Sequence, residues 1–179
     1  MTSKRTTLAR LRVHPLPGDR RRGRLVAGAL VVPCALGRSG PTRRKREGDG
    51  GTPVGRFRLI GVAFRPDRGL RPRTLLPLKA IRPDDGWCDD SSDRRYNRPI
   101  RLPDKAGHER MWRADGLYDL VVDIAWNRGP IRRGWGSAIF LHLAREGFGP
   151  TEGCVALSRP ALRRLLARIG PRTRIEIVG

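Results

Sequence analysis

Hydrophobic residues occur along this chain in short runs that glycine, proline and charged residues interrupt. Runs of this length, bounded by turn-forming residues, are typical of β-strands rather than of long helices. The run at 136–144 is apolar enough to be a central strand. The pattern also predicts two short strands within residues 23–40 and single strands at 56–64, 117–127 and 173–178.

One segment has the spacing of an amphipathic helix. Ser158 is a favourable N-cap, and Pro160 suits the first helical turn. Gly170 and Pro171 end the pattern. The apolar face of this helix consists of Leu162, Leu165, Leu166 and Ile169. The sequence therefore predicts a β-rich domain with one helix late in the chain.

The other segments are rich in turn-forming and charged residues. Residues 1–23 are polar and basic and are predicted to form an N-terminal arm, which leaves 24–179 as one domain. Residues 65–116 are the least regular part, and Trp87 and Trp112 stand among charges there. Because loops this long inside a compact domain are usually functional or disordered, we expect this segment to cover a site.

The chain is strongly basic, with 38 Lys and Arg against 17 Asp and Glu and a net charge of +21. A field of this sign attracts polyanions such as nucleic acid, anionic lipid or an acidic cell-wall polymer. The alternative is that arginine serves only as a general surface cation. A nucleic-acid-binding protein has little further support, because aromatic residues are not interleaved with the basic runs as stacking platforms require.

Three cysteines, Cys34, Cys88 and Cys154, are widely spaced. Their odd number and spacing indicate neither a disulfide framework nor a zinc site. The Cys88-Asp89-Asp90 stretch together with His108 matches no standard metal site either. We therefore expect no metal and no cofactor.

Residues 20–37 combine a basic run with an apolar run, as an export signal does. The apolar run begins late, at Leu25, and continues into sequence that is typical of a folded domain. We therefore favour a buried pair of strands here and keep an export signal as the alternative. No run of about 18 apolar residues exists, so no membrane-spanning helix is predicted.

Cys154 and His142 form a candidate nucleophile and base. His142 lies at the end of a predicted strand, and Cys154 lies in a turn just before the predicted helix. An adjacent imidazole can convert a thiol into the reactive thiolate. Gly153 allows a close approach of the backbone, so the amides of Gly153 and Cys154 could hold a developing oxyanion. The alternative is a buried thiol beside a core histidine.

Three stretches together resemble the L,D-transpeptidase catalytic domain, often called the YkuD domain. These are TPVG at 52–55, IFLH at 139–142 and TEGCVALS at 151–158, in the order typical of that family. The resemblance covers residues 24–178. Glu152 replaces a usual histidine and Ala156 a usual arginine, and the loop before Thr151 is short.

The resemblance implies a mainly β, sandwich or barrel-like YkuD fold with the helix packed on the sheet. It implies that Cys154 attacks a peptidoglycan peptide stem, releases D-Ala and passes the acyl group to an amine, which forms a cross-link. His142 would shuttle the proton, and the carbonyl of Leu143 would orient its ring. An L,D-carboxypeptidase that uses water shares every residue, and a wall-binding module without catalysis is a further alternative.

The resemblance also implies a substrate, a location and binding residues. The partner would be peptidoglycan stems, with electrostatic contact to the acidic wall, in the periplasm or cell envelope. Arginine can bind the carboxylates of such stems through two parallel hydrogen bonds. The candidate substrate-binding residues are Thr151, Glu152, His108, Tyr96, Arg133 and Arg145.

Overall fold

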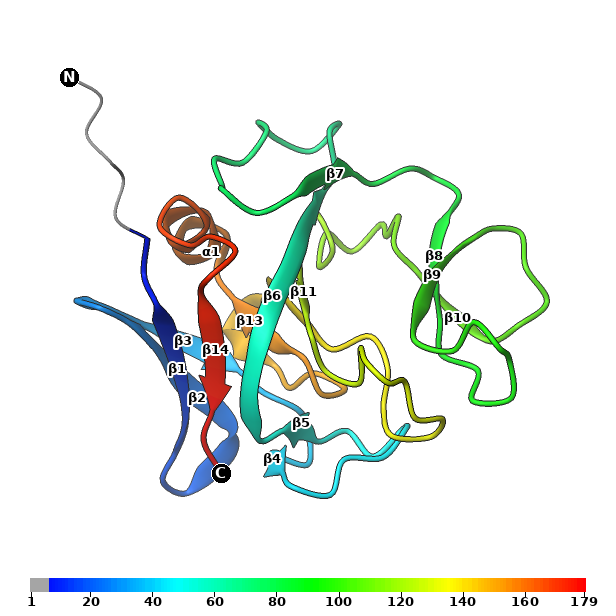
Figure 1. Cartoon of the computed structure of the whole chain (residues 1–179). Helices are drawn as coiled ribbons and strands as arrows, with labels where there is room; N and C mark the ends of the chain where they lie inside the picture. The colour runs from blue at the N-terminus through cyan, green and yellow to red at the C-terminus, as the bar shows by residue number, and fades with distance from the viewer. Residues whose placement is uncertain (1–6) are drawn as a thin grey trace.

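The computed structural model describes residues 7–179, so the first six residues of the expected arm lie outside it. Within residues 7–179, nine strands form the main sheet in the order β11-β12-β13-β3-β2-β1-β14-β6-β7. Because β11 also pairs with β6, the sheet closes on itself into a barrel-like ring (Figure 1). The strands are β1 (Arg10–Leu16), β2 (Asp19–Ala27), β3 (Leu30–Ala35), β6 (Gly55–Phe64), β7 (Leu78–Ala80), β11 (Leu120–Ile124), β12 (Phe140–Leu143), β13 (Val155–Leu157) and β14 (Arg174–Ile177).

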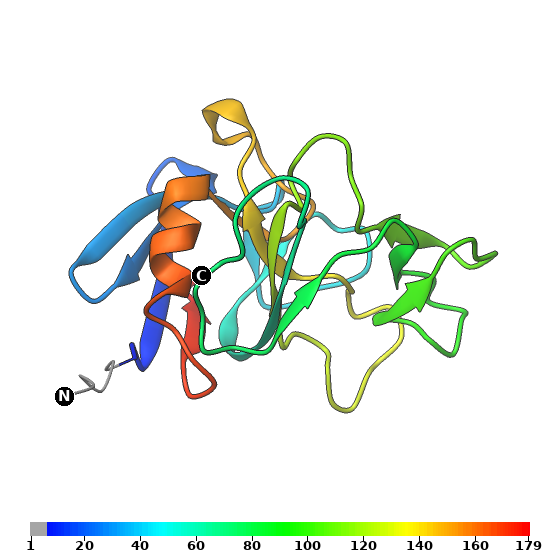
Figure 2. The same ribbon diagram turned by 90° about the horizontal axis from the view of Figure 1, so that it is seen from above.

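Smaller elements flank this ring. A second sheet, which we call the cover sheet, has the strand order β10-β8-β9 and stands beside the ring in both views (Figures 1 and 2). The flanking elements are β8 (Asp85–Cys88), β9 (Arg98–Arg101), β10 (His108–Arg110), the short pair β4 (Pro41–Thr42) and β5 (Thr52–Pro53), the 3-10 helix η1 (Glu146–Phe148) and the helix α1 (Arg159–Leu166). The mainly β class with a helix near the C-terminal end, predicted from the sequence, is confirmed.

Alternation along β11, β12 and β13 divides the hydrophobic residues between two cores. Every second residue, such as Val122, Leu141 and Val155, belongs to the main core, to which α1 also contributes its leucines. The intervening residues, such as Phe140 and Cys154, face the other way and pack with the cover-sheet residue Trp87. Both faces of these strands are therefore buried, which matches their nearly continuous apolar sequences.

The helix begins as the sequence predicts. Ser158 has extended backbone angles, and its side chain accepts a hydrogen bond from the amide of Ala161, as an N-cap does. The helix ends at Leu166, earlier than the apolar spacing suggests, and the amide of Arg168 bonds to the carbonyl of Leu165 at 2.9 Å, which is a tighter turn than that of an α-helix. Ile169 is nonetheless fully buried in the main core.

The segment predicted to be an arm differs most from its prediction. The structure places residues 10–23 in strands β1 and β2 of the main sheet rather than in an arm. Leu11 and Val13 are fully buried, whereas Arg10 and Arg12, which alternate with them, are exposed. This is the two-residue alternation of a half-buried strand, which the high density of basic residues hides. The strand pair expected within residues 23–40 is confirmed as the β2–β3 hairpin.

Two other predictions are corrected in detail. The irregular segment 65–116 contains β7 and the whole cover sheet, whose strands are too short to give a clear alternation. The strand predicted at 136–144 begins only at Phe140, because Gly136 and Ala138 have positive φ angles of 95° and 51°. In residues 7–179, no helix is long and apolar enough to cross a membrane.

Replacing Leu11 tests whether residues 10–16 belong to the core. Because Leu11 is fully buried, we expect Leu11→Ala to lower the free energy of unfolding by about 2–5 kcal/mol. The matched control is Leu70→Ala, since Leu70 is 83% exposed and should change stability by less than about 0.5 kcal/mol. Urea unfolding curves measure both. Equal, small effects would show that residues 10–16 act as an arm.

Candidate active site

The parallel pairing of β12 and β13 brings His142 and Cys154 to one face of the sheet. His142 lies opposite Ala156, and Leu141 lies opposite Val155, so Cys154 stands two positions before the partner of His142. Residues two apart on a strand point to the same side. Both side chains consequently line one cavity of about 330 Å³ between the ring and the cover sheet.

The thiol of Cys154 is held by main-chain groups. Its Sγ donates to the carbonyl of Ala138 at 3.2 Å and accepts from the amide of Phe140 at 3.3 Å. Burial, followed by the nearby carboxylate of Glu109, raises the pKa of Cys154 to about 12. The thiol is therefore protonated at neutral pH in the free protein.

The imidazole of His142 is buried and oriented by its neighbour. Its Nδ1 lies 2.8 Å from the carbonyl oxygen of Leu143. Because a carbonyl can only accept, Nδ1 carries the proton and Nε2 keeps its lone pair. Burial lowers the pKa of His142 to about 4, so the ring is neutral at pH 7. Cys154 and His142 thus face the cavity as an uncharged thiol and an uncharged base.

The turn that carries Cys154 requires glycine. Gly153 has a φ of +133°, and a Cβ added there would lie 2.8 Å from the carbonyl oxygen of Gly51. The Thr151 hydroxyl holds the turn, because it donates to the Cys154 carbonyl at 2.7 Å and accepts from the Gly153 amide at 3.2 Å. The Gly153 amide, expected to face an oxyanion, is therefore already occupied.

The TPVG turn is connected to the cysteine turn through the backbone of residues 37–38. Thr52 is fully buried and its hydroxyl accepts from the amide of Gly37 at 2.8 Å. The next residue, Arg38, donates its amide to the carbonyl of Thr151 at 2.8 Å. This connection explains physically why two motifs that lie far apart in the sequence occur together.

Charged side chains surround the cavity. They are Lys45, Glu47, Asp89, Glu109, Arg113, Arg145 and Glu152. Desolvation raises the pKa values of Asp89 and Glu109. Sequence reasoning missed Glu47 and Glu109, because single carboxylates in irregular segments carry no pattern. Among the described residues, no group of three or more His, Cys, Asp or Glu is placed to hold a metal ion.

The predicted binding residues divide into two groups. Thr151, Glu152 and Arg145 line the cavity, and the carboxylate of Glu152 pairs with Arg38 at 2.7 Å. The other three are outside its lining. Tyr96 is buried and reaches the cavity indirectly, because its hydroxyl donates to Glu47.

The remaining two predicted residues lie further out. His108 is on β10, and its Nδ1 donates to the carbonyl of Ala106 at 2.7 Å. Arg133 is an exposed residue of the loop that precedes β12. The structure therefore brings together the residues near the cysteine motif but not those chosen from the irregular segments.

Comparison with known proteins adds an independent observation. The sequence profile of the L,D-transpeptidase catalytic domain matches residues 19–177. Among solved structures, the chain is similar to L,D-transpeptidase 1 of Mycobacterium tuberculosis, with 14% identity and a TM-score of 0.39. That alignment covers 94% of this chain and 62% of the solved chain. No curated protein sequence matches significantly.

The buried state of His142 predicts a pH dependence of stability. The unfolded imidazole takes up a proton near its ordinary pKa of 6.5, whereas the folded one does so at about 4. Between these values the unfolded state binds more protons, so the free energy of unfolding falls as the pH falls. The loss attributable to His142 is about 3 kcal/mol, and it should be complete near pH 4.

Urea unfolding of the wild type and of His142→Gln between pH 7.5 and pH 4 measures this loss. The stability difference between the two proteins should shift by that amount, in favour of the variant, as the pH is lowered. His14→Gln, on β1 and half-buried, is the matched control. A difference that stays constant with pH would contradict a buried, neutral His142.

Proposed function

The chain belongs to the L,D-transpeptidase catalytic domain family, and from this premise we propose that it is a cysteine acyltransferase acting on peptidoglycan peptide stems. The observation that carries the proposal is that Cys154 and His142 line one cavity, with the ring of His142 oriented by the Leu143 carbonyl. This arrangement supplies a nucleophile, a base and an element that orients the base.

Proton transfer accompanies attack. Both charged forms are disfavoured by burial, so the resting pair is neutral. As Sγ of Cys154 attacks the stem carbonyl that precedes D-Ala, its proton passes to Nε2 of His142. The C–N bond then breaks, and His142 returns the proton to the leaving amine of D-Ala. The product is a thioester between Cys154 and the stem.

Main-chain amides would stabilise the oxyanion that forms during the attack. The Gly153 amide donates to the Thr151 hydroxyl, so we assign the role of oxyanion donor to the amide of Cys154. The part of Gly153 is then steric, because its missing side chain lets the turn pack against Gly51. Thr151 acts through the turn rather than on the substrate.

Charged residues at the cavity favour an amine as the second substrate. Among the described residues, the carboxylates of Glu47, Asp89 and Glu109 line it without a basic partner at salt-bridge distance, so they attract an ammonium group. Of the cations in the same lining, Lys45 and Arg113 are each already paired with an aspartate. Transfer of the acyl group to an amine would form a cross-link, which makes the protein an L,D-transpeptidase. Transfer to water, as in an L,D-carboxypeptidase, uses the same residues and is the alternative.

The other predicted residues have separate proposed roles. Arg145 lines the cavity and is suited to hold a stem carboxylate. Tyr96 would position Glu47, and His108 would act as part of the cover sheet. For Arg133, which is exposed, the proposed role is only to contribute positive charge to the surface. Because peptidoglycan lies outside the cytoplasmic membrane, the proposed place of action is the periplasm or cell envelope.

A carbapenem tests the proposed nucleophile. We expect the wild-type protein to gain the mass of one drug molecule in intact mass spectrometry, because the thiolate opens the β-lactam ring. Cys154→Ala should gain none. Cys34→Ala is the matched control and should still gain the drug, because the Cys34 thiol, although buried with a similarly raised pKa of about 12, lies in the main core and not in the cavity lining.

Folded wild-type protein that forms no adduct would exclude the proposed chemistry in its usual form. An adduct that persists in Cys154→Ala would assign the nucleophile to another residue. With a tetrapeptide stem as donor, dimers in the products indicate transpeptidation, whereas tripeptides alone indicate hydrolysis.

We also propose that a basic row on the main sheet contacts the acidic wall. The row consists of Arg10, Arg174 and Arg58, which lie side by side on β1, β14 and β6. Like charges at directly opposite positions destabilise a sheet. Glu176 lies 3.7 Å from Arg10 and compensates part of this charge, and an anionic partner would relieve the remaining repulsion. A row that crosses three neighbouring strands suits an extended polymer rather than a small ligand.

Removing this row should weaken binding to isolated cell walls. The triple change of these arginines to glutamine is expected to lower retention about tenfold at low salt and to have little effect at 1 M salt, where charges are screened. Sedimentation with purified walls measures retention. The same change at Arg43, Arg71 and Arg73, three exposed arginines elsewhere, is the control for net charge. Equal losses in both variants would show that only total charge matters.

A further inference from the structure

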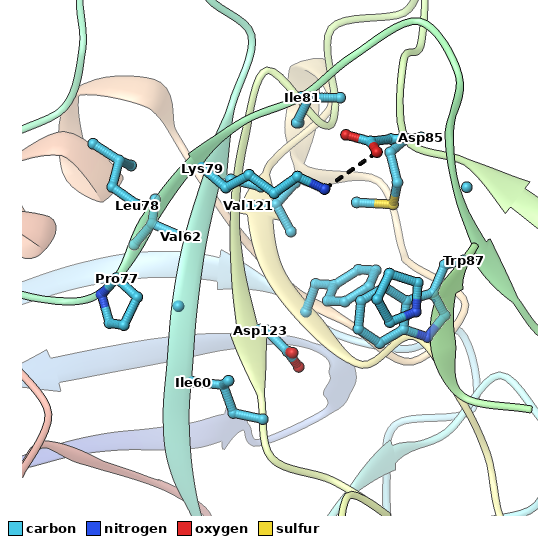
Figure 3. Close-up of a pocket in the computed structure, with 16 residues that line it drawn as sticks. Ile60, Val62, Pro77, Leu78, Lys79, Ile81, Asp85, Trp87, Val121 and Asp123 are labelled. Carbon is cyan, nitrogen blue, oxygen red and sulfur yellow. Dashed lines mark hydrogen bonds and ion pairs between the residues drawn. The ribbon is translucent and has the colours of Figure 1, made fainter. Parts of the chain in front are cut away.

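A second cavity of about 360 Å³ lies on the same side of the sheet, between β6, β7, β11 and the cover sheet (Figure 3). Its lining includes Phe140 but neither Cys154 nor His142. Its wall is mostly apolar and includes Ile60, Pro77, Leu78, Trp87 and Val121. A concave, largely apolar site with a few polar groups is the usual form of a small-molecule site.

Asp123 is the unusual polar group in this wall. Its side chain is 17% exposed, and its carboxylate receives no hydrogen bond from any described residue. Its ionic contact is Arg128, whose Nη2 lies 3.2 Å from Oδ2. The other terminal nitrogen of Arg128 donates to the carbonyl of Asn97, and its guanidinium lies over Trp87. Asp123 is therefore incompletely paired. Burial raises its pKa to about 6, because this effect is larger than the lowering by the positive charge of Arg128.

At the opposite rim of the cavity, the other acidic residue of the lining, Asp85, is well paired. Asp85 is paired with Lys79 at 3.2 Å and with Arg101 at 2.6 Å, and it also accepts from the amide of Arg82. Figure 3 shows the Lys79–Asp85 pair at one end of the cavity and the Asp123 carboxylate at the other, near Ile60. An entering cation could therefore add a hydrogen bond at Asp123, whereas Asp85 already has its partners.

We propose that this cavity binds a small organic cation with an apolar body, such as an aryl-alkyl amine. The ammonium group would donate to the carboxylate of Asp123, and the body would pack against Trp87 and Ile60. Burial of the apolar body and completion of the Asp123 pairing both favour the complex. This proposal does not depend on the acyl transfer proposed above.

The same occupant would influence Cys154 through Phe140. The rings of Trp87 and Phe140 meet edge to face with centroids 5.0 Å apart, and both line the cavity. The amide of Phe140 donates to Sγ of Cys154. Tyr118 packs edge to face on Phe140 and on His142. A ligand that shifts the first two rings therefore changes the surroundings of the thiol and the imidazole.

Binding of 4-phenylbutylamine and of its uncharged analogue 4-phenylbutanol tests the site. Titration calorimetry of the wild type should give an affinity at least about tenfold higher for the amine, because only the amine pairs with Asp123. Asp123→Asn should remove this preference by weakening the amine alone. Asp84→Asn is the matched control, since Asp84 is exposed and lies outside the cavity lining.

Ile60→Trp, which fills the cavity, should weaken both probes. Equal affinities for amine and alcohol in the wild type would overturn the proposal, and so would a preference that survives in Asp123→Asn. The wild-type comparison needs no variant, so it decides even where a variant fails to fold.

The rate at which iodoacetamide alkylates Cys154 tests the coupling. At a saturating concentration of the amine we expect this rate to change at least threefold, while that of Cys34 stays constant. An unchanged rate at saturation would overturn the coupling. Neither alkylation nor binding requires acyl transfer, so failure of the proposed enzymatic function would be seen separately.

Discussion

The pairing of β13 with β12 is the constraint on which the site depends. It is parallel and only three residue pairs long, so it needs support from the turn that precedes it. That support is a close approach of backbones, since a Cβ on Gly37 would lie 3.1 Å from the Cα of Gly153 and 2.1 Å from the carbonyl oxygen of Gly50. The depth and direction of Cys154 are thus fixed by glycines that carry no chemistry themselves.

Burial on both faces of this part of the sheet sets the electrostatics of the site. The inner face forms the main core, and the outer face lies beneath the cover sheet. Cys154 and His142 are both buried, and this burial keeps the thiol and the imidazole neutral in the free protein. The same layer beneath the cover sheet holds both cavities, with Phe140 between them. The site of the proposed acyl transfer and the proposed small-molecule site are therefore neighbours in one layer.

Three features could be predicted from the sequence because each depends on local patterns. They are the mainly β class, the helix that begins after Ser158 and the strand that ends beside His142. The strand at 10–16 escaped detection, since its two buried residues stand among arginines that dominate the composition. The surroundings of the cysteine escaped for a different reason. Glu47 and Glu109 reach the cavity only through the fold, and single residues in irregular segments have no periodicity to reveal them.

Closure of the ring has a consequence for the order of folding. Strand β14, the last strand along the chain, lies between β1 and β6 and pairs with both. Its contact with β1 joins residues 164 positions apart, as in the Arg12–Glu176 hydrogen bond. Contacts of such separation form late, because a long loop must close first. During synthesis on the ribosome, β1 and β6 would expose unpaired edges until residues 174–177 emerge, and until then these edges could pair with strands of other chains.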